Sequence, residues 1–380
     1  MQFRSIPILF LIIFNLNIVS QVGETPIKVF GYFQTTFTHS REDVGKSEST
    51  SFNIQQLNII LQKDLAKKWT AFTNLEFVNT FSSSKLWGDF NLDEVWVRYR
   101  HDSRLILKLG LSVPIFNNFN EINNKTPVMP YIIRPIAYET SFGEFIDIEE
   151  YVPQRTFVQA YGHLTFDDIK LDYAFHLGNS PNISSRDQIG QQSGTDTTKL
   201  FSYGGRLGIR KNGLKFGISG SYDRLNNYKE KTVESASSSI VLPDDLRNEL
   251  PRYRVGSDLS FFIDNFFFEG EFINVIYDDK HPLFKLDKTF YYATVGYNFC
   301  EDIIGYITYW RTKEYKTSKS NESDPDTYST LKIPGLGISY DLNDRTRLKL
   351  QFAPVEYKTT GSEDASSSFT FFGLAISVFF

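Results

Sequence analysis

The chain ends in the stretch Phe369-Thr-Phe-Phe-Gly-Leu-Ala-Ile-Ser-Val-Phe-Phe380, which alternates in hydrophobicity and has an aromatic last residue. Counting back from the end, every second residue is large and apolar: Phe380, Val378, Ile376, Leu374 and Phe372. The residues between them include Ser377, Ala375 and Gly373. This alternation predicts a strand with one face in lipid and one small or polar face. A chain end this apolar would fray in water, so we predict that the strand lies in a membrane.

The amino-terminal residues have the pattern of a secretory signal peptide. A short basic stretch, residues 1–4, precedes an apolar stretch at 6–19, and Ser20 is a small residue suited to cleavage. We predict that residues 1–20 are removed and that residues 21–380 form one transmembrane domain. No later run reaches the roughly 18 apolar residues that a spanning helix needs. The sequence therefore predicts an exported protein without a helical anchor.

Composition favours a membrane β-structure and argues against nucleic-acid binding and a disulfide framework. Aromatic residues make up 16% of the chain, although its mean hydropathy is −0.29. This combination suits strands whose lipid-facing and water-facing residues alternate. The net charge of −5 is spread along the chain, so we expect no nucleic-acid partner, which would need a clustered basic face. The single cysteine, Cys300, excludes an intrachain disulfide.

Sixteen segments of about ten residues alternate in hydrophobicity and are bounded by turn residues. They are 27–38, 52–63, 69–80, 91–101, 104–112, 155–166, 169–178, 201–211, 214–224, 252–263, 266–277, 288–299, 303–314, 329–341, 346–356 and 369–380. An even number of strands is typical of closed antiparallel bacterial barrels.

The connections between these segments alternate in length. Tight turns such as Asp167-Asp168 and Asn212-Gly213 follow the even-numbered segments, and their residue types supply the left-handed backbone of short hairpins. Long polar connections such as 179–200 and 225–251 follow the odd-numbered ones. Short periplasmic turns and long outer loops characterise transmembrane barrels. We therefore predict an all-β fold, a closed antiparallel transmembrane β-barrel of 16 strands.

The alternation also predicts which charged residues face inward. An Arg or Lys on the lipid face costs about 2–4 kcal/mol near the membrane midplane, so the charged face of each strand should line the lumen. This rule predicts nine pore-lining bases: Arg98, Arg100, Lys108, Arg155, Lys170, Arg206, Arg254, Arg347 and Lys349. Trp69 and Trp310 suit an aromatic girdle at the membrane interfaces. Trp96 has inward parity and should pack inside the pore.

The longest connection, residues 113–153, is the third on the loop side and holds five of the chain's 14 prolines. Its apolar pieces at 130–133 and 142–146 would be unfavourable in a freely solvated loop. Long ordered loops are usually functional, so we predict a constriction loop folded into the lumen. It carries six acids, namely Glu121, Glu139, Glu144, Asp147, Glu149 and Glu150, against two bases. An acidic loop facing a basic wall would set ion selectivity; the alternative is that these are ordinary solvated or mutually paired charges.

Sixteen strands, an inward third loop and the terminal Phe380 resemble the porin superfamily over the whole mature chain. The passage Leu107-Lys-Leu-Gly-Leu-Ser-Val-Pro-Ile115 is similar to barrels related to phosphate-selective porins. The resemblance implies a location in bacterial outer-membrane lipid, insertion by the barrel-assembly machinery, and a homotrimer. It also implies passive diffusion of ions and other small hydrophilic solutes, with no enzymatic activity, cofactor or metal.

Two alternatives remain open. An outer-membrane hydrolase would need a polar set such as His176 with Ser180 and Asp172, but the sequence has no nucleophile elbow, HExxH or CxxC motif. A lumen-lining histidine is the simpler interpretation of His176. A non-conducting binding or adhesion barrel would instead use the serine-rich, charged loops 229–248 and 316–328.

Overall fold

The computed structural model describes residues 25–42, 48–79, 88–122, 125–138, 151–153, 155–180, 196, 198, 200–224, 232–235, 238–241, 251–277, 284–318, 326–361 and 365–380. The predicted signal peptide, residues 1–20, lies outside this part of the chain.

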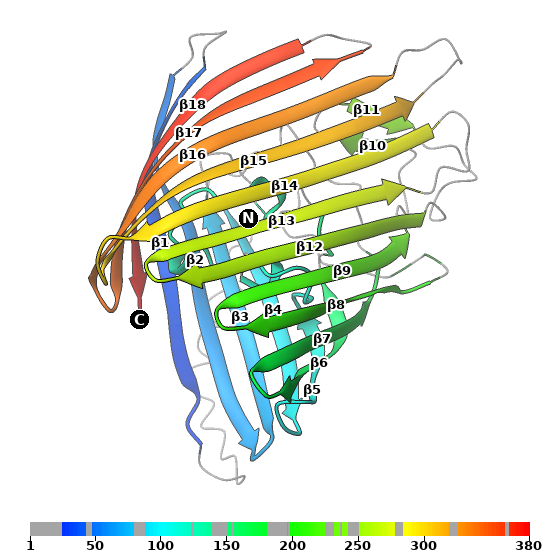
Figure 1. The fold of residues 1–380 in the computed structure, drawn as a ribbon, viewed down its shortest axis with the longest axis vertical. Helices are drawn as coiled ribbons and strands as arrows, with labels where there is room; N and C mark the ends of the chain where they lie inside the picture. Colours follow the sequence, from blue (N-terminus) through cyan, green and yellow to red (C-terminus); the bar gives the residue numbers. More distant parts are fainter. Residues whose placement is uncertain are drawn as a thin grey trace, which may run out of the picture.

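Sixteen strands of the described chain form one closed antiparallel barrel, which confirms the predicted fold class (Figure 1). The strands are β1 (Lys28–Glu42), β2 (Glu48–Ala66), β3 (Trp69–Asn79), β4 (Asp89–Arg100), β5 (Ile106–Ser112), β6 (Thr156–Phe166), β7 (Ile169–Gly178), β8 (Ser202–Lys211), β9 (Leu214–Arg224), β12 (Pro251–Ile263), β13 (Phe266–Tyr277), β14 (Phe284–Asn298), β15 (Ile303–Ser318), β16 (Thr327–Asn343), β17 (Thr346–Thr360) and β18 (Ala365–Phe379). Each overlaps one predicted segment. A separate two-stranded sheet, β10 (Thr232–Ser235) and β11 (Ser238–Val241), was not predicted.

The barrel closes where the first strand meets the last. Along β1 and β18 the register runs from Tyr32 opposite Phe379 to Glu42 opposite Phe369. The backbone N–H of Gly31 donates to the Phe380 carbonyl at 2.9 Å, and the Phe380 N–H donates to the Gly31 carbonyl at 3.0 Å. A Cβ on residue 31 would lie 2.2 Å from the backbone carbonyl oxygen of Asn58 and 2.7 Å from the Phe380 ring, so this position requires glycine. The terminal residue is therefore part of the closure.

The outer face of the barrel is apolar. On β18, Phe372 and Leu374 are exposed while Phe371 and Ala375 are buried, as the alternation predicts. Large exposed apolar side chains continue along the other strands, with Ile209 on β8 and Ile307 on β15 as examples. Soluble proteins rarely expose so extensive an apolar surface. The surface is compatible with lipid around the barrel.

Tight turns join strands at one end of the barrel and contain the residue types expected for them. Asp167, Asn212 and Asp264 have positive φ values of 51°, 46° and 51°. Asn and Asp tolerate this left-handed backbone better than other residues that carry a side chain. We call this the turn end of the barrel.

Three short 3-10 helices lie in the connection between β5 and β6. They are η1 (Asn120–Ile122), η2 (Thr126–Val128) and η3 (Ile136–Tyr138). No helix in the described part of the chain is long and apolar enough to cross a membrane.

Part of the inner wall along β13–β18 is apolar, which the sequence did not predict. Phe290, Tyr292, Trp310, Ile333 and Phe371 form one buried cluster with side chains of the β5–β6 connection. Trp310 is fully buried, so its predicted place in an interfacial girdle is wrong. Both faces of its strand carry aromatic residues, and alternation could not choose between them. Trp69 is 40% exposed beside a turn, which agrees with an interfacial position.

Candidate channel site

The residues that follow β5 contact inward-facing side chains around the barrel. We call residues 113–138 the inner segment; residues 123 and 124 are outside its described part. At its start, the Ile115 N–H donates to Gln159 Oε1 on β6 at 2.9 Å. Further along, the Ile132 carbonyl accepts from Gln55 Nε2 on β2 at 2.6 Å. The prediction that the whole connection 113–153 folds into the lumen stays a prediction, because 139–150 lies outside the described residues.

Strand β17 holds the middle of the inner segment. Gln351 Oε1 accepts hydrogen bonds from the backbone N–H groups of Ile132 and Ile133, each at 2.7 Å. Lys349 Nζ donates to the carbonyls of Thr126 at 2.7 Å and Tyr131 at 3.2 Å, and to a side-chain oxygen of Gln34 on β1 at 2.7 Å. Three acceptors satisfy the three N–H donors of an ammonium. Backbone carbonyls thus replace water around this buried charge.

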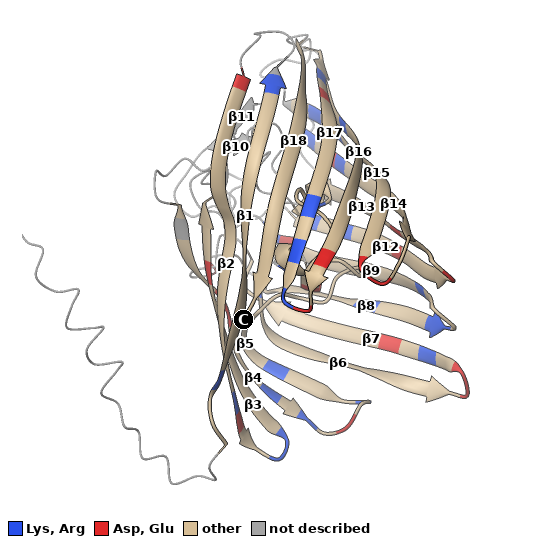
Figure 2. Ribbon diagram, turned by 90° about the vertical axis from the view of Figure 1, so that its left-hand side faces the viewer, with Lys and Arg blue, Asp and Glu red and all other residues tan. Residues whose placement is uncertain are grey.

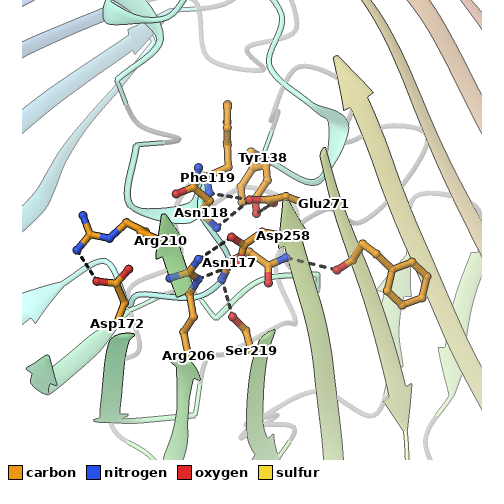
Figure 3. A network of polar contacts seen from close by, with 11 residues as sticks. Asn117, Asn118, Phe119, Tyr138, Asp172, Arg206, Arg210, Ser219, Asp258 and Glu271 are labelled. Atoms are coloured by element: carbon orange, nitrogen blue, oxygen red, sulfur yellow. Dashed lines mark hydrogen bonds and ion pairs between the residues drawn. The ribbon is translucent and has the colours of Figure 1, made fainter. Parts of the chain in front are cut away.

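Glu271 on β13 holds both ends of the inner segment (Figure 3). Its carboxylate accepts from the N–H groups of Asn118 at 2.9 Å and Phe119 at 2.7 Å, and from the Tyr138 hydroxyl at 2.5 Å. Hydrogen bonds to a charged acceptor are the stronger kind. The segment therefore solvates a wall carboxylate that is only 5% exposed.

A second carboxylate lies directly opposite Glu271, because Asp258 on β12 is its partner in the strand register. Like charges at opposed positions destabilise a sheet. Arg206 on β8 neutralises Asp258 through two hydrogen bonds of 2.9 and 2.6 Å (Figure 3). The two carboxylates are thus compensated separately, one by the wall and one by the inner segment.

Glycines on the inner face make room for this arrangement. A Cβ on Gly208 or Gly217 would overlap the Arg206 guanidinium, and a Cβ on Gly256 would overlap the Asn117 side chain. Asn117 has φ 52°, and its N–H donates to Ser219 Oγ at 2.8 Å. The absence of side chains at these glycines therefore leaves the space that Arg206 and the start of the inner segment occupy.

Five of the nine predicted bases are largely buried and compensated. Arg155 pairs with Asp93 at 2.5 Å, Arg206 with Asp258 at 2.6 Å, and Arg254 with Asp223 at 2.6 Å. Arg347 pairs with Asp341 and also donates to the Val128 carbonyl, and Lys349 is bound as described above. These positions match the alternative of mutually paired lumen charges.

The other four predicted bases, Arg98, Arg100, Lys108 and Lys170, lie near the turn end. Arg100 and Lys170 are exposed, and Arg98 and Lys108 are half-buried. None of the four forms an ion pair with a carboxylate of the described chain. Arg98 and Lys108 are opposed on β4 and β5. The structure therefore separates the predicted bases into a compensated group and an accessible group.

The indole ring of Trp96 lies against two of the accessible bases. Arg98 Cζ lies 5.7 Å and Lys108 Nζ 5.0 Å from the centre of its ring. The ring stacks on Phe72 with centroids 4.5 Å apart, and Nε1 donates to Glu94 Oε2 at 3.0 Å. The tryptophan packs inside the barrel, as its parity predicted. Cation–π contacts hold both bases over one aromatic surface.

The predicted constriction acids Glu139, Glu144, Asp147, Glu149 and Glu150 lie outside the described residues. Glu121, the sixth acid of the loop, is in η1 and is half-buried. Burial raises the pKa of Glu121, and the positive charges of Lys108 and Lys125 oppose that rise. This carboxyl group thus interacts electrostatically with one accessible base of the wall.

Comparison with solved structures finds similar barrels over nearly the whole chain. OmpT, an outer membrane protein of Vibrio cholerae, has a TM-score of 0.58 at 10% identity, covering 95% of this chain and 100% of that one. Its trimer form has a TM-score of 0.56 at 11% identity, with 94% and 100% covered. The anion-selective porin of Comamonas acidovorans has a TM-score of 0.58 at 13% identity, with 94% and 100% covered. The outer membrane channel DcaP of Acinetobacter baumannii has a TM-score of 0.56 at 11% identity, with 93% and 97% covered.

The chain has the fold of outer-membrane porins. No sequence family model matches it, and no curated protein is similar to it in sequence. These solved structures support the predicted porin fold, whereas nothing among them supports the narrower likeness to phosphate-selective porins. A closed barrel of this fold with an apolar outer face belongs in the bacterial outer membrane.

Several residues of this porin-like interior were not predicted as site residues. They are the acids Asp93, Asp223, Asp258 and Glu271, together with the bases Arg210 and Lys215. The alternation that placed Arg206 inward also places Asp258 inward, so their facing could have been found. Their pairing could not, because Arg206 and Asp258 are 52 positions apart and are not on neighbouring strands.

The three residues of the hydrolase alternative do not form hydrogen bonds with one another. His176 is 2% exposed, and neither of its ring nitrogens has a hydrogen-bond partner among the described residues. The carboxylate of Asp172 pairs with Arg210 on β8, and the Ser180 N–H donates to Asp196 at 2.7 Å. The structure therefore shows no hydrogen bond that links His176 to Ser180 or Asp172.

Proposed function

We propose that the protein is a porin-like channel for passive diffusion of ions and other small hydrophilic solutes, and not an enzyme. The observation that carries the proposal is the unequal inner wall of the closed barrel. The inner segment packs on β13–β18 through an apolar cluster and buried polar contacts, while accessible charged side chains face inward on β4, β5, β7 and β8. Charged inward positions that remain accessible to water are expected along an aqueous pathway.

The inner segment is the constriction in this proposal. Hydrogen bonds to β2, β6, β9, β13 and β17 fix it across the interior. It would thereby narrow the lumen without blocking it. Solutes would pass between the inner segment and the accessible charges. The trimer form of OmpT supports a homotrimer, and the terminal Phe380 suits recognition by the barrel-assembly machinery and insertion into outer-membrane lipid.

Single-channel recording of the purified mature protein in a planar bilayer tests the proposal. Stable steps whose size is proportional to voltage are expected. A silent bilayer, with the folded protein shown to be inserted, would contradict a channel and favour a hydrolase or a non-conducting adhesion barrel.

Neutralising Arg98 and Lys108 together, as Arg98→Gln with Lys108→Gln, should shift the permeability of the channel toward cations. These bases are half-buried, have no ion pair with a carboxylate of the described chain and lie over Trp96, so their field acts on passing ions. The reversal potential under a salt gradient measures the shift. An unchanged ion preference would remove both residues from the selectivity of the channel.

A further inference from the structure

Three cations lie side by side on the inner wall near the turn end. Lys170 on β7 is the register partner of Arg210 on β8, and Arg210 is the partner of Lys215 on β9. Their strand neighbours Leu171, Ile209 and Phe216 are exposed on the apolar outer face, so alternation directs all three cations inward. We call Lys170, Arg210 and Lys215 the turn-end row.

The turn-end row has fewer carboxylates than cations. Asp172 pairs with Arg210, with their side chains 20% and 37% exposed. Lys170 and Lys215 form no ion pair in the described part of the chain. Directly opposed like charges are unfavourable in a sheet. The row therefore keeps an excess of positive charge at the inner surface, and Figure 2 shows basic and acidic positions together toward this end of β7 and β8.

Other bases on the inner wall of the same strands and their neighbour β12 are buried and paired. Arg206, only 10% exposed, and the fully buried Arg254 are each bonded to an aspartate. Charges that are paired and buried contribute little net field to the lumen. The turn-end row is accessible instead, with Lys170 exposed and Lys215 half-buried. The field on a passing solute is thus set near the turns rather than at the buried pairs.

We propose that the turn-end row makes the channel favour anions, in particular small solutes that carry a carboxylate or phosphate group. Ammonium and guanidinium groups donate charge-assisted hydrogen bonds to such oxyanions. A cationic patch inside a low-dielectric wall raises the local concentration of anions. This inference rests on the proposed channel function and adds its solute class and the location of its selectivity.

The test compares two pairs of lysines at the same end of the barrel. The variant Lys170→Gln with Lys215→Gln removes both unpaired cations and keeps the Arg210–Asp172 pair. The control Lys67→Gln with Lys68→Gln removes two exposed lysines from the β2–β3 turn. Reversal potentials are read in about 0.1 M salt, where the Debye length is about 10 Å. The anion-to-cation permeability ratio should fall by about threefold or more in the variant and stay unchanged in the control.

A third variant should change the anion-to-cation permeability ratio in the opposite direction. Asp172→Asn removes the one carboxylate of the described residues that pairs with the row, so it should raise the anion-to-cation permeability ratio. Replacing chloride first by acetate and then by phosphate shows which oxyanion the row favours. An unchanged ratio in the Lys170/Lys215 variant, or an equal fall in the control, would overturn the inference while the conductance steps still support a channel. A wild-type protein that gives no steps contradicts the proposed function itself.

Discussion

Glu271→Gln should release the inner segment from β13 and increase the single-channel conductance. The wild-type carboxylate accepts three hydrogen bonds, from Asn118, Phe119 and Tyr138. Each bond to a charged group contributes about 1.5–3 kcal/mol. The amide of glutamine can keep its oxygen on both backbone N–H groups, but it replaces the oxygen that accepts from the Tyr138 hydroxyl by an NH₂ group. The attachment should therefore weaken by about 1.5–3 kcal/mol, the contribution of the bond to Tyr138.

Conductance in planar bilayers and protease cleavage within residues 117–138 measure this release. Glu314→Gln is the matched control, because Glu314 is as buried as Glu271 and pairs with Lys288 at 3.2 Å. In the described part of the chain, its ion pair is with β14 and not with the inner segment. Wild-type conductance and protease resistance in the Glu271 variant would show that the bonds to β17 are sufficient to hold the segment.

Asp223→Asn should destabilise the barrel more than any change at an exposed charge. Asp223 is fully buried and bonded to Arg252 at 2.7 and 3.0 Å and to Arg254 at 2.6 Å. Removing one member of a buried ion-pair set costs about 3–5 kcal/mol, because the remaining charge keeps its desolvation penalty. Unfolding by urea in lipid vesicles measures the loss of stability.

Two further variants separate charge from packing in this prediction. Asp168→Asn breaks an exposed ion pair with Lys211, 3.1 Å long, and should leave stability unchanged. The combined variant Asp223→Leu, Arg252→Met and Arg254→Met removes all three charges and should recover most of the wild-type stability. If Asp223→Asn is as stable as the wild type, the buried cluster is not a major source of stability.

Much of the barrel could be predicted because a membrane imposes a simple rule on each strand. Lipid accepts only apolar side chains, so every strand carries the period of two that is visible within about ten residues. The turns are equally local, since Asn212 and Asp264 take the left-handed backbone without help from distant residues. These features do not depend on which strands are neighbours.

Trp310 marks where that local rule fails. Its strand carries aromatic residues on both faces, and the rule assumes a polar lumen. The inner segment supplies an apolar partner inside the barrel, so Trp310, Phe290 and Ile333 can face inward. No residue near position 310 in the sequence indicates that such a partner is present.

The charges of the interior divide in the same way. The alternation by itself determined that Arg98, Lys108, Arg206 and Arg254 face the lumen. Only the tertiary structure decided that two of them are neutralised and two remain accessible. The pairing of Arg206 with Asp258 reaches across β9 over Gly217, and it requires the exact register of three strands. Whether a side chain faces the lumen follows from the alternation of polarity within one strand. Its pairing and burial depend on distances to residues far away in the chain.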